Sequence, residues 1–285
     1  AFTATQIAAL DATDMAEFAA TQVAAMTTTQ VGALSNTNFA ALADTQVEAL
    51  TTTQLTAVSA TKIAAMTATQ TGALTSTQIA SLSTTQVRAF TNANLSALDA
   101  SQSAALTGAQ IASLSTGQIN SLNATDVADL TATQVVAMAT TQVKALTATV
   151  IGDMTETQVA AFTATQIANL ATGNVAGLAE TQAAALTAGQ VAAFTASQIK
   201  ELSDTNLSAL NATQVAAITA TQIKALTNTQ VEALTAADVA EFTAAQLASL
   251  TTSQMAALNA TNMASLNATQ VASFTATQVA RLGTE

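Results

Sequence analysis

Large apolar residues recur along the chain in an octet whose register does not slip. One column contains Leu, Phe, Met, Ile or Val at all 36 of its positions, beginning Phe2, Leu10, Phe18, Met26. A second apolar column follows five residues later, beginning Ile7, Met15, Val23, Val31. Three of its members, Thr71, Ser103 and Ala183, are not large and apolar. The chain therefore consists of one unit repeated from end to end.

The spacing inside each octet predicts a short helix. Ile7 and Leu10 stand three residues apart, which places them on one helical face, whereas in a strand they would point to opposite faces. The position after the Leu column holds Thr, Ser, Asp or Asn at 30 of 36 places, the residues that cap helix N-termini. Pairs such as Thr3 with Gln6 have the spacing of a capping box. We therefore expect one to one and a half turns of helix, a corner, and a new cap.

Two other architectures were considered. A continuous helix would rotate the apolar pair by about 80° per octet, so no seam would persist. A β-solenoid would suit Thr and Val, and the Thr3-x-Thr5 pattern resembles the Thr-x-Thr of flat β-helical ice binders. The three-residue apolar spacing and the capping residues both oppose a β-solenoid. The predicted fold is an all-α solenoid of very short helices, with a β-solenoid as the alternative.

A longer period appears where the Gln column holds another residue. The ten exceptions are Asp14, Asn38, Lys62, Asn94, Asp126, Val150, Asn174, Asn206, Asp238 and Asn262. They are separated by three, three, four and four octets in rotation, a mean close to 3.5 octets or 28 residues. The full cycle is 112 residues, and Asn94-Leu-Ser-Ala-Leu98 recurs after that interval as Asn206-Leu-Ser-Ala-Leu210. Thr71, Ser103 and Ala183 each fall in the octet after one of these exceptions.

This period predicts a superhelix with about 3.5 octets per coil. Octet i would contact octets i+3 and i+4, as residues do on an α-helix. The two apolar columns would fill the axis, and small Ala and Thr would let coils approach closely. We expect a single continuous solenoid over residues 1–285 without an internal boundary, a rod on the order of 100 Å long.

The exceptions in the Gln column would mark one longitudinal face of this superhelix. We predict that this face makes a lateral contact between rods; the alternative is a solvent face relieved of a constraint met elsewhere. Its candidate residues are Asp14, Asn38, Lys62, Asn94, Asp126, Asn174, Asn206, Asp238 and Asn262.

Composition removes most chemistry from consideration. His, Cys, Pro, Trp and Tyr are all absent, so the chain has no disulfide, zinc-finger or haem ligands and no Cys/His nucleophile pair. Six Lys and Arg against 17 Asp and Glu give a net charge of −11, which offers no basic surface for nucleic acid or anionic lipid. A polar residue interrupts every octet, so no membrane span is expected. We expect neither an enzyme, a cofactor nor a small-molecule substrate.

Three acidic pairs recur with the 112-residue cycle, each with three-residue spacing: Asp14/Glu17, Asp126/Asp129 and Asp238/Glu241. One hypothesis is a weak calcium site at each pair. The simpler interpretation is that Asp replaces Gln near a helix N-terminus, where negative charge is favoured.

The octets, for example Leu-Thr-Thr-Ser-Gln-Met-Ala-Ala at residues 250–257, resemble the Ala/Thr/Gln octapeptide arrays of very large bacterial secreted or surface proteins. Those proteins are often labelled adhesin-like or haem-utilisation-like. The resemblance covers the whole chain and implies an extracellular or cell-surface fibre or spacer. The haem label gains no support here, because His and Tyr are absent and Met is a poor substitute.

The sequence therefore predicts a structural protein, a fibre-forming subunit or stalk segment of a bacterial surface appendage. Its partner would be itself, through end-to-end or lateral assembly. The alternative function is an ice-binding or other ligand-binding module that uses the ranked Thr columns.

Overall fold

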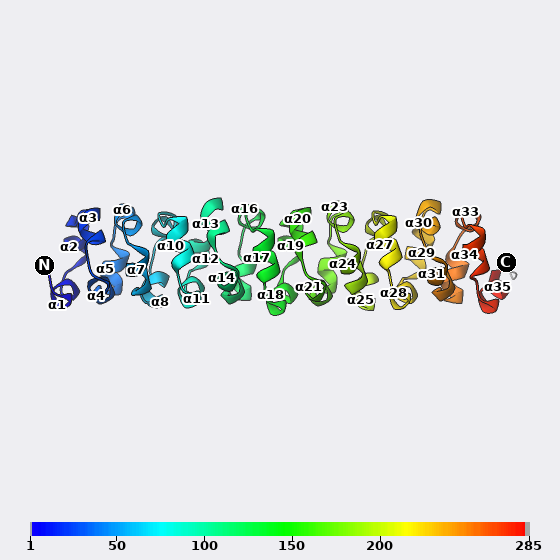
Figure 1. Cartoon of the computed structure of the whole chain (residues 1–285), viewed down its shortest axis with the longest axis horizontal. Helices are drawn as coiled ribbons and strands as arrows, with labels where there is room; N and C mark the ends of the chain where they lie inside the picture. Colours follow the sequence, from blue (N-terminus) through cyan, green and yellow to red (C-terminus); the bar gives the residue numbers. More distant parts are fainter. Residues whose placement is uncertain (1, 283–285) are drawn as a thin grey trace. The chain divides into compact units, whose positions relative to one another are not determined.

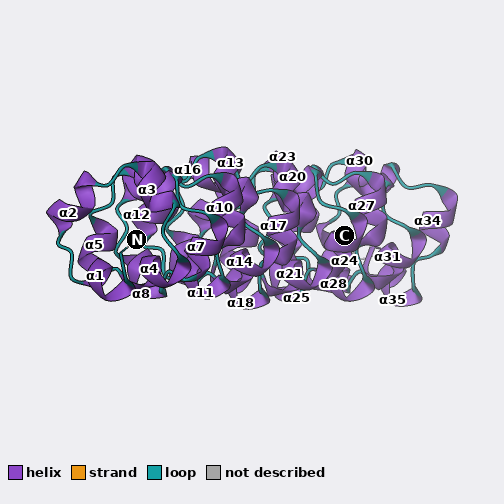
Figure 2. Ribbon diagram, turned by 60° about the vertical axis from the view of Figure 1, so that its left-hand side comes forward, coloured by secondary structure: helices purple, strands orange, loops and turns teal. Residues whose placement is uncertain are grey.

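The computed structural model describes residues 2–282 and is all-helical, with 68% of the chain in helices and no strand in the described part. Figure 2 shows short helices joined by loops. The helices run from four residues in α12 (Asn92–Leu95) to seven in α35 (Ala276–Leu282). The predicted all-α solenoid of short helices is confirmed. The β-solenoid and the single long helix are wrong.

The chain divides into two compact units, Ala1–Gln142 and Val143–Glu285. The division falls inside helix α18 (Thr140–Ala145), so it coincides with no change in the octet pattern. Each unit is described by itself below. The expectation of one uninterrupted solenoid over residues 1–285 stays a prediction.

Unit 1, drawn from blue to green in Figure 1, contains one helix per octet. Its helices before α18 are α1 Ala4–Ala8, α2 Ala12–Glu17, α3 Ala20–Ala24, α4 Thr28–Ala33, α5 Asn36–Ala40, α6 Asp44–Glu48, α7 Thr52–Thr56, α8 Ala60–Ala64, α9 Ala68–Gly72, α10 Ser76–Ser81, α11 Thr84–Arg88, α12 Asn92–Leu95, α13 Ala100–Ala105, α14 Gly108–Ser113, α15 Thr116–Asn120, α16 Ala124–Ala128 and α17 Ala132–Ala137.

Unit 2, drawn from green to red, repeats the same design. Its helices after α18 are α19 Ala148–Asp153, α20 Glu156–Ala161, α21 Ala164–Asn169, α22 Thr172–Ala176, α23 Glu180–Ala184, α24 Ala188–Ala193, α25 Ala196–Ile199, α26 Asp204–Ser208, α27 Ala212–Ala217, α28 Ala220–Ala225, α29 Asn228–Ala233, α30 Ala236–Ala240, α31 Ala244–Ser249, α32 Thr252–Ala257, α33 Ala260–Ala264, α34 Ala268–Ala272 and α35 Ala276–Leu282.

Each helix starts at the predicted cap and stops at the Leu column. In α4, the Thr27 hydroxyl accepts a hydrogen bond from the Gln30 N–H, and Gln30 Oε1 accepts one from the Thr27 N–H. At the other end Leu34 leaves the helical conformation (φ −53°, ψ 140°) after its N–H has donated to the Val31 carbonyl. The capping boxes at Thr3/Gln6 and Thr27/Gln30 are confirmed, and they explain why the chain turns every eight residues.

Coils stack with the predicted offset inside each unit. Helix n packs against helix n+3, as α4 does on α7 in unit 1 and α24 on α27 in unit 2. Hydrogen bonds also reach the helix four places away, since Gln54 in α7 donates to the Val23 carbonyl of α3. Contacts at both three and four octets confirm about 3.5 octets per coil within each unit.

The two apolar columns form the core of each unit. Val31 and Val47 of the second column are fully buried, and Leu34 and Leu50 of the first are almost so. Burying a side chain of this size stabilises the fold by about 1.5–3 kcal/mol. Coils approach closely between these residues. A Cβ on Gly108, for example, would lie only 2.8 Å from the Ala137 Cβ of the next coil.

Candidate functional site

The dominant polar feature is a Gln side chain that joins its own helix to the coil before it. Gln54 Oε1 accepts from the Thr51 N–H at 2.7 Å, which completes the capping box. Its Nε2 donates to the carbonyls of Met26 at 2.7 Å, Val23 at 3.0 Å and Ala24 at 3.1 Å, all 28 to 31 residues earlier. One buried amide therefore serves a helix start and a helix end together.

The same arrangement recurs through both units, and we call it the glutamine ladder. Its members donate Nε2 to the carbonyl of the Leu-column residue 28 positions earlier. In unit 1 the pairs include Gln46–Phe18, Gln70–Leu42, Gln78–Leu50, Gln86–Val58, Gln102–Leu74, Gln110–Leu82, Gln118–Phe90, Gln134–Leu106 and Gln142–Leu114. In unit 2 they include Gln182–Met154, Gln190–Phe162, Gln198–Leu170, Gln214–Leu186, Gln222–Phe194, Gln230–Leu202, Gln246–Ile218, Gln254–Leu226, Gln270–Phe242 and Gln278–Leu250.

The ladder answers the main problem of a protein made of one-turn helices. Every helix leaves carbonyls at its C-terminal end without an intrahelical donor, and in this fold those carbonyls are buried by the next coil. Glu would complete a capping box as well as Gln does, but a carboxylate has no N–H to give to the carbonyls. The amide is therefore required wherever a coil lies beneath it.

The predicted lateral-contact residues do not lie on a free surface. Seven of the nine are buried within the chain, with exposed fractions of 1–8%: Asn38, Lys62, Asn94, Asp126, Asn174, Asn206 and Asn262. Asp238 is half-buried and Asp14 exposed. The prediction that these side chains contact another rod is corrected for the seven, because they occupy ladder positions and face the preceding coil.

Most exceptions keep a donor for that coil. The Nδ2 of Asn38, Asn94, Asn174, Asn206 and Asn262 donates at 2.6–3.0 Å to the carbonyl 28 residues earlier. The Lys62 ammonium donates to the Gly32 carbonyl at 2.8 Å. The shorter Asn reaches the Leu-column carbonyl alone, whereas Gln also reaches those of the helix before it. These residues are therefore weaker rungs of the ladder.

The three atypical residues of the second apolar column lie beneath exceptions. Asn94 Nδ2 donates to the Thr71 hydroxyl at 2.8 Å, and that hydroxyl donates to the Thr67 carbonyl at 3.0 Å. The separation of Asn94 from Thr71 is 23 residues. Ser103 lies 23 residues before Asp126, and both line a cavity of about 20 Å³. Ala183 precedes Asn206 by the same interval. The 112-residue period therefore records matched pairs in successive coils.

A double-mutant cycle tests this pairing. Thr71→Val should destabilise the protein by about 1–2 kcal/mol, because it removes the hydroxyl that accepts from the buried Asn94 amide. Asn94→Gln in the Thr71→Val background should recover part of the loss, since Val beneath Gln is the common combination. Urea denaturation of the four proteins gives the coupling energy. Additive effects would show that the two positions act independently.

The acidic pairs use their carboxylates within the fold. Asp126 Oδ2 accepts from the Asn123 N–H at 3.1 Å. Asp238 Oδ2 accepts from the Thr235 N–H at 2.7 Å and from the Ser208 hydroxyl at 2.8 Å. Partial burial, with the nearby charge of Asp238, raises the pKa of Glu241. Residues 2–282 contain no group of three or more potential metal-binding side chains, so the calcium hypothesis gains no support from geometry.

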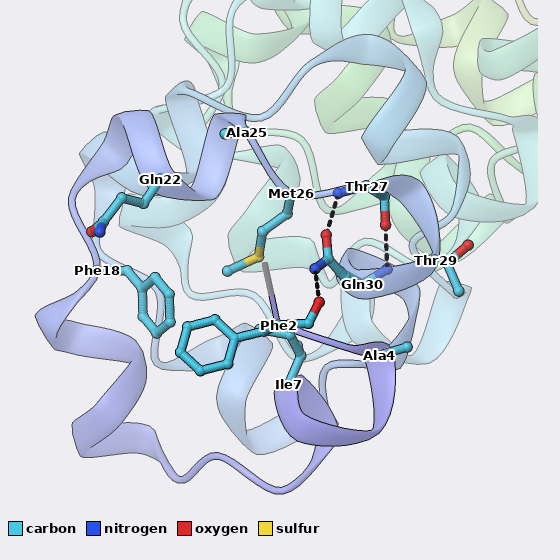
Figure 3. A pocket seen from close by; sticks show the side chains of 10 residues that line it. All are labelled: Phe2, Ala4, Ile7, Phe18, Gln22, Ala25, Met26, Thr27, Thr29 and Gln30. Carbon is cyan, nitrogen blue, oxygen red and sulfur yellow. Dashed lines mark hydrogen bonds between the residues drawn. The ribbon is translucent and has the colours of Figure 1, made fainter.

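The first coil presents an open surface, which we call the N-terminal surface (residues 2–30). It encloses a cavity of about 500 Å³ lined by Phe2, Ile7, Phe18, Gln22, Met26 and Gln30, among others (Figure 3). The Phe2 and Phe18 rings meet edge to face, with centroids 6.1 Å apart, and Phe2 is 53% exposed. In Figure 3 the Gln30 amide donates to the Phe2 carbonyl, while Gln22 reaches away from that pair.

Two ladder donors on this surface lack an acceptor. Gln6 and Gln22 are exposed, and each gives its Oε1 to the N–H of its own cap, Thr3 and Ala19. Neither Nε2 donates to any group in residues 2–282, because no coil lies beneath it.

The last coil presents the opposite chemistry on what we call the C-terminal surface (residues 255–281). Val271 and Val279 are 48% and 54% exposed, although Val231 and Val239 in the same column are fully buried. The carbonyls of Leu258, Leu266 and Phe274 would each meet a ladder residue 28 positions later, and no described residue donates to them. This surface therefore offers acceptors where the N-terminal surface offers donors.

Capping alone does not reveal the ladder, and sequence reasoning missed it. The signal was the near-exclusive use of Gln where Glu caps equally well, combined with the 28-residue period. The C-terminal carbonyls belong to the backbone and leave no mark in a sequence.

None of the described helices is long and apolar enough to cross a bilayer. In comparisons with known proteins, no family model and no curated protein matched the sequence.

Proposed function

We propose that this chain is a structural protein, a filament-forming subunit or stalk segment whose function is its shape. The observation that carries the proposal is the glutamine ladder, which repeats one inter-coil bond from coil to coil in both units. In a repeat array, such nearest-neighbour contacts supply the stability and let length grow by adding units.

The use of side chains supports the same conclusion. The large apolar residues pack the core, the ladder and cap residues bond to the backbone, and charged residues make up only 8% of the chain. Few groups remain with the activated neighbours and the pocket that catalysis requires. An extracellular or cell-surface location belongs to the proposal through the octapeptide resemblance.

The alternative of an ice-binding face loses one of its two Thr columns to capping. The hydroxyls of cap residues such as Thr51 and Thr75 accept from the Gln N–H of their own helices. No observation favours that alternative over a structural role.

Negative-stain imaging of the purified chain tests the proposal. We expect filaments of uniform width that lengthen as the protein concentration is raised, with matching growth of fast-sedimenting species in the ultracentrifuge. Particles of one fixed size at every concentration, in the presence or absence of divalent cations, would contradict self-assembly.

A further inference from the structure

The two open surfaces fit each other, and we propose that the N-terminal surface binds the C-terminal surface of a second copy of this chain, head to tail. The inference deepens the proposed function, because it specifies the joint through which a filament would grow. Each step below uses a contact that already occurs between coils inside the protein.

The donors and acceptors match in kind and in spacing. Gln6 and Gln22 stand two octets apart and carry Nε2 groups without acceptors. The carbonyls of Leu258 and Phe274 also stand two octets apart and receive no ladder bond. Placing Gln6 over Leu258 puts Gln22 over Phe274. The joint would then reproduce the inter-coil bond found between Gln54 and Met26.

Apolar surface would be buried at the same time. The N-terminal surface exposes Phe2 and leaves Leu10 and Phe18 half-buried, whereas the same column is buried farther along. The C-terminal surface exposes Val271 and Val279. Exposed apolar groups rimmed by polar ones mark interaction surfaces, and the core of each unit shows how these columns pack together.

The joint has a direction. Like surfaces do not complement one another, since two N-terminal surfaces would bring donors to donors and two C-terminal surfaces acceptors to acceptors. Contact between unlike surfaces is heterologous, and it generates an open polymer when the rotation does not close a ring. We therefore expect polar filaments rather than symmetric dimers.

One position in the joint is mismatched. In the register above, Asp14 lies over the Leu266 carbonyl, so a carboxylate would face a backbone acceptor. Inside the chain, Asn at the same column donates to that carbonyl, as Asn38 does to Leu10. Asp14 therefore weakens the joint, and its replacement by Asn should strengthen it.

The test compares three single variants with the parent chain by sedimentation velocity over a range of concentrations. Asp14→Asn should lower the concentration needed for assembly about tenfold, the effect of one added hydrogen bond. Gln22→Glu should raise it at least about tenfold, because it removes a donor and sets a carboxylate against a carbonyl. Thr85→Glu adds the same charge at an exposed site away from both surfaces and should leave assembly unchanged.

The outcomes separate the joint from the broader function. Filaments that respond equally to Gln22→Glu and Thr85→Glu would overturn the head-to-tail joint and leave a structural role intact. A chain that stays monomeric, even as Asp14→Asn, would overturn both. Thermal melting below the assembly concentration checks the fold, and Gln22→Glu should melt with the parent because its Oε1 bond to the Ala19 N–H is retained.

Discussion

Replacing Gln54 by Glu is expected to destabilise the protein by about 3 kcal/mol or more at neutral pH. The side chain is 3% exposed, and its Nε2 donates to three carbonyls of the preceding coil. The substitution keeps the shape and the bond to the Thr51 N–H, but it buries a negative charge among acceptors. Urea denaturation at pH 7 measures the loss.

The same variant should recover stability in acid. Desolvation and the facing carbonyls disfavour the charged form, so the introduced carboxyl has a higher pKa in the folded state than its unfolded value of about 4.3. The penalty is therefore absent below the unfolded value, grows as the pH rises, and is complete above the folded value. The difference from the parent chain should shrink between pH 7 and about pH 4. A difference independent of pH would refute the ladder as its cause.

Gln6→Glu is the matched control. Gln6 occupies the same column and accepts from the Thr3 N–H at 2.8 Å, but its Nε2 has no acceptor among the described residues. The control should therefore change stability little, measured below the concentration at which chains associate. A large loss would mean that Gln stabilises mainly by capping.

The sequence predicted this fold well because its rules are local. Three-residue spacing of Ile7 and Leu10 indicated a helix, and Thr3 with Gln6 indicated where it starts. Both act within one octet, so tertiary structure had little opportunity to override them. The 3.5-octet coil was also predictable, because the exceptions in the Gln column repeat with the pitch of the superhelix.

The functional interpretation of those exceptions was wrong for the buried positions. Their period indicated one face of the superhelix, but a period does not distinguish a face that meets solvent from one that meets the next coil. Asn94 is 1% exposed because its amide replaces that of Gln over the Met66 carbonyl. The unlike residue at Thr71 contained the missing information, since a polar residue in the apolar column requires a polar partner.

Deleting residues 219–226, the octet that contains α28, is expected to leave unit 2 folded, whereas deleting residues 219–222 should unfold much of it. In the whole-octet deletion Gln230 comes to lie 28 positions after Phe194, whose carbonyl now accepts from Gln222 at 2.8 Å. Every Gln-column residue beyond the deletion again meets a Leu-column carbonyl. The loss should be limited to one helix and a few degrees in Tm.

In the half-octet deletion Gln230 lies 28 positions after Gln198, and Gln246 lies 28 after Gln214. Both rungs then oppose helix interiors instead of corners, which orphans two buried amides at a cost of roughly 2–6 kcal/mol, and the apolar columns lose their alignment. Circular dichroism and hydrogen exchange of the two deletions would distinguish them. Since the smaller deletion should do the greater damage, equal damage or the reverse order would show that coils are not held in register by the ladder.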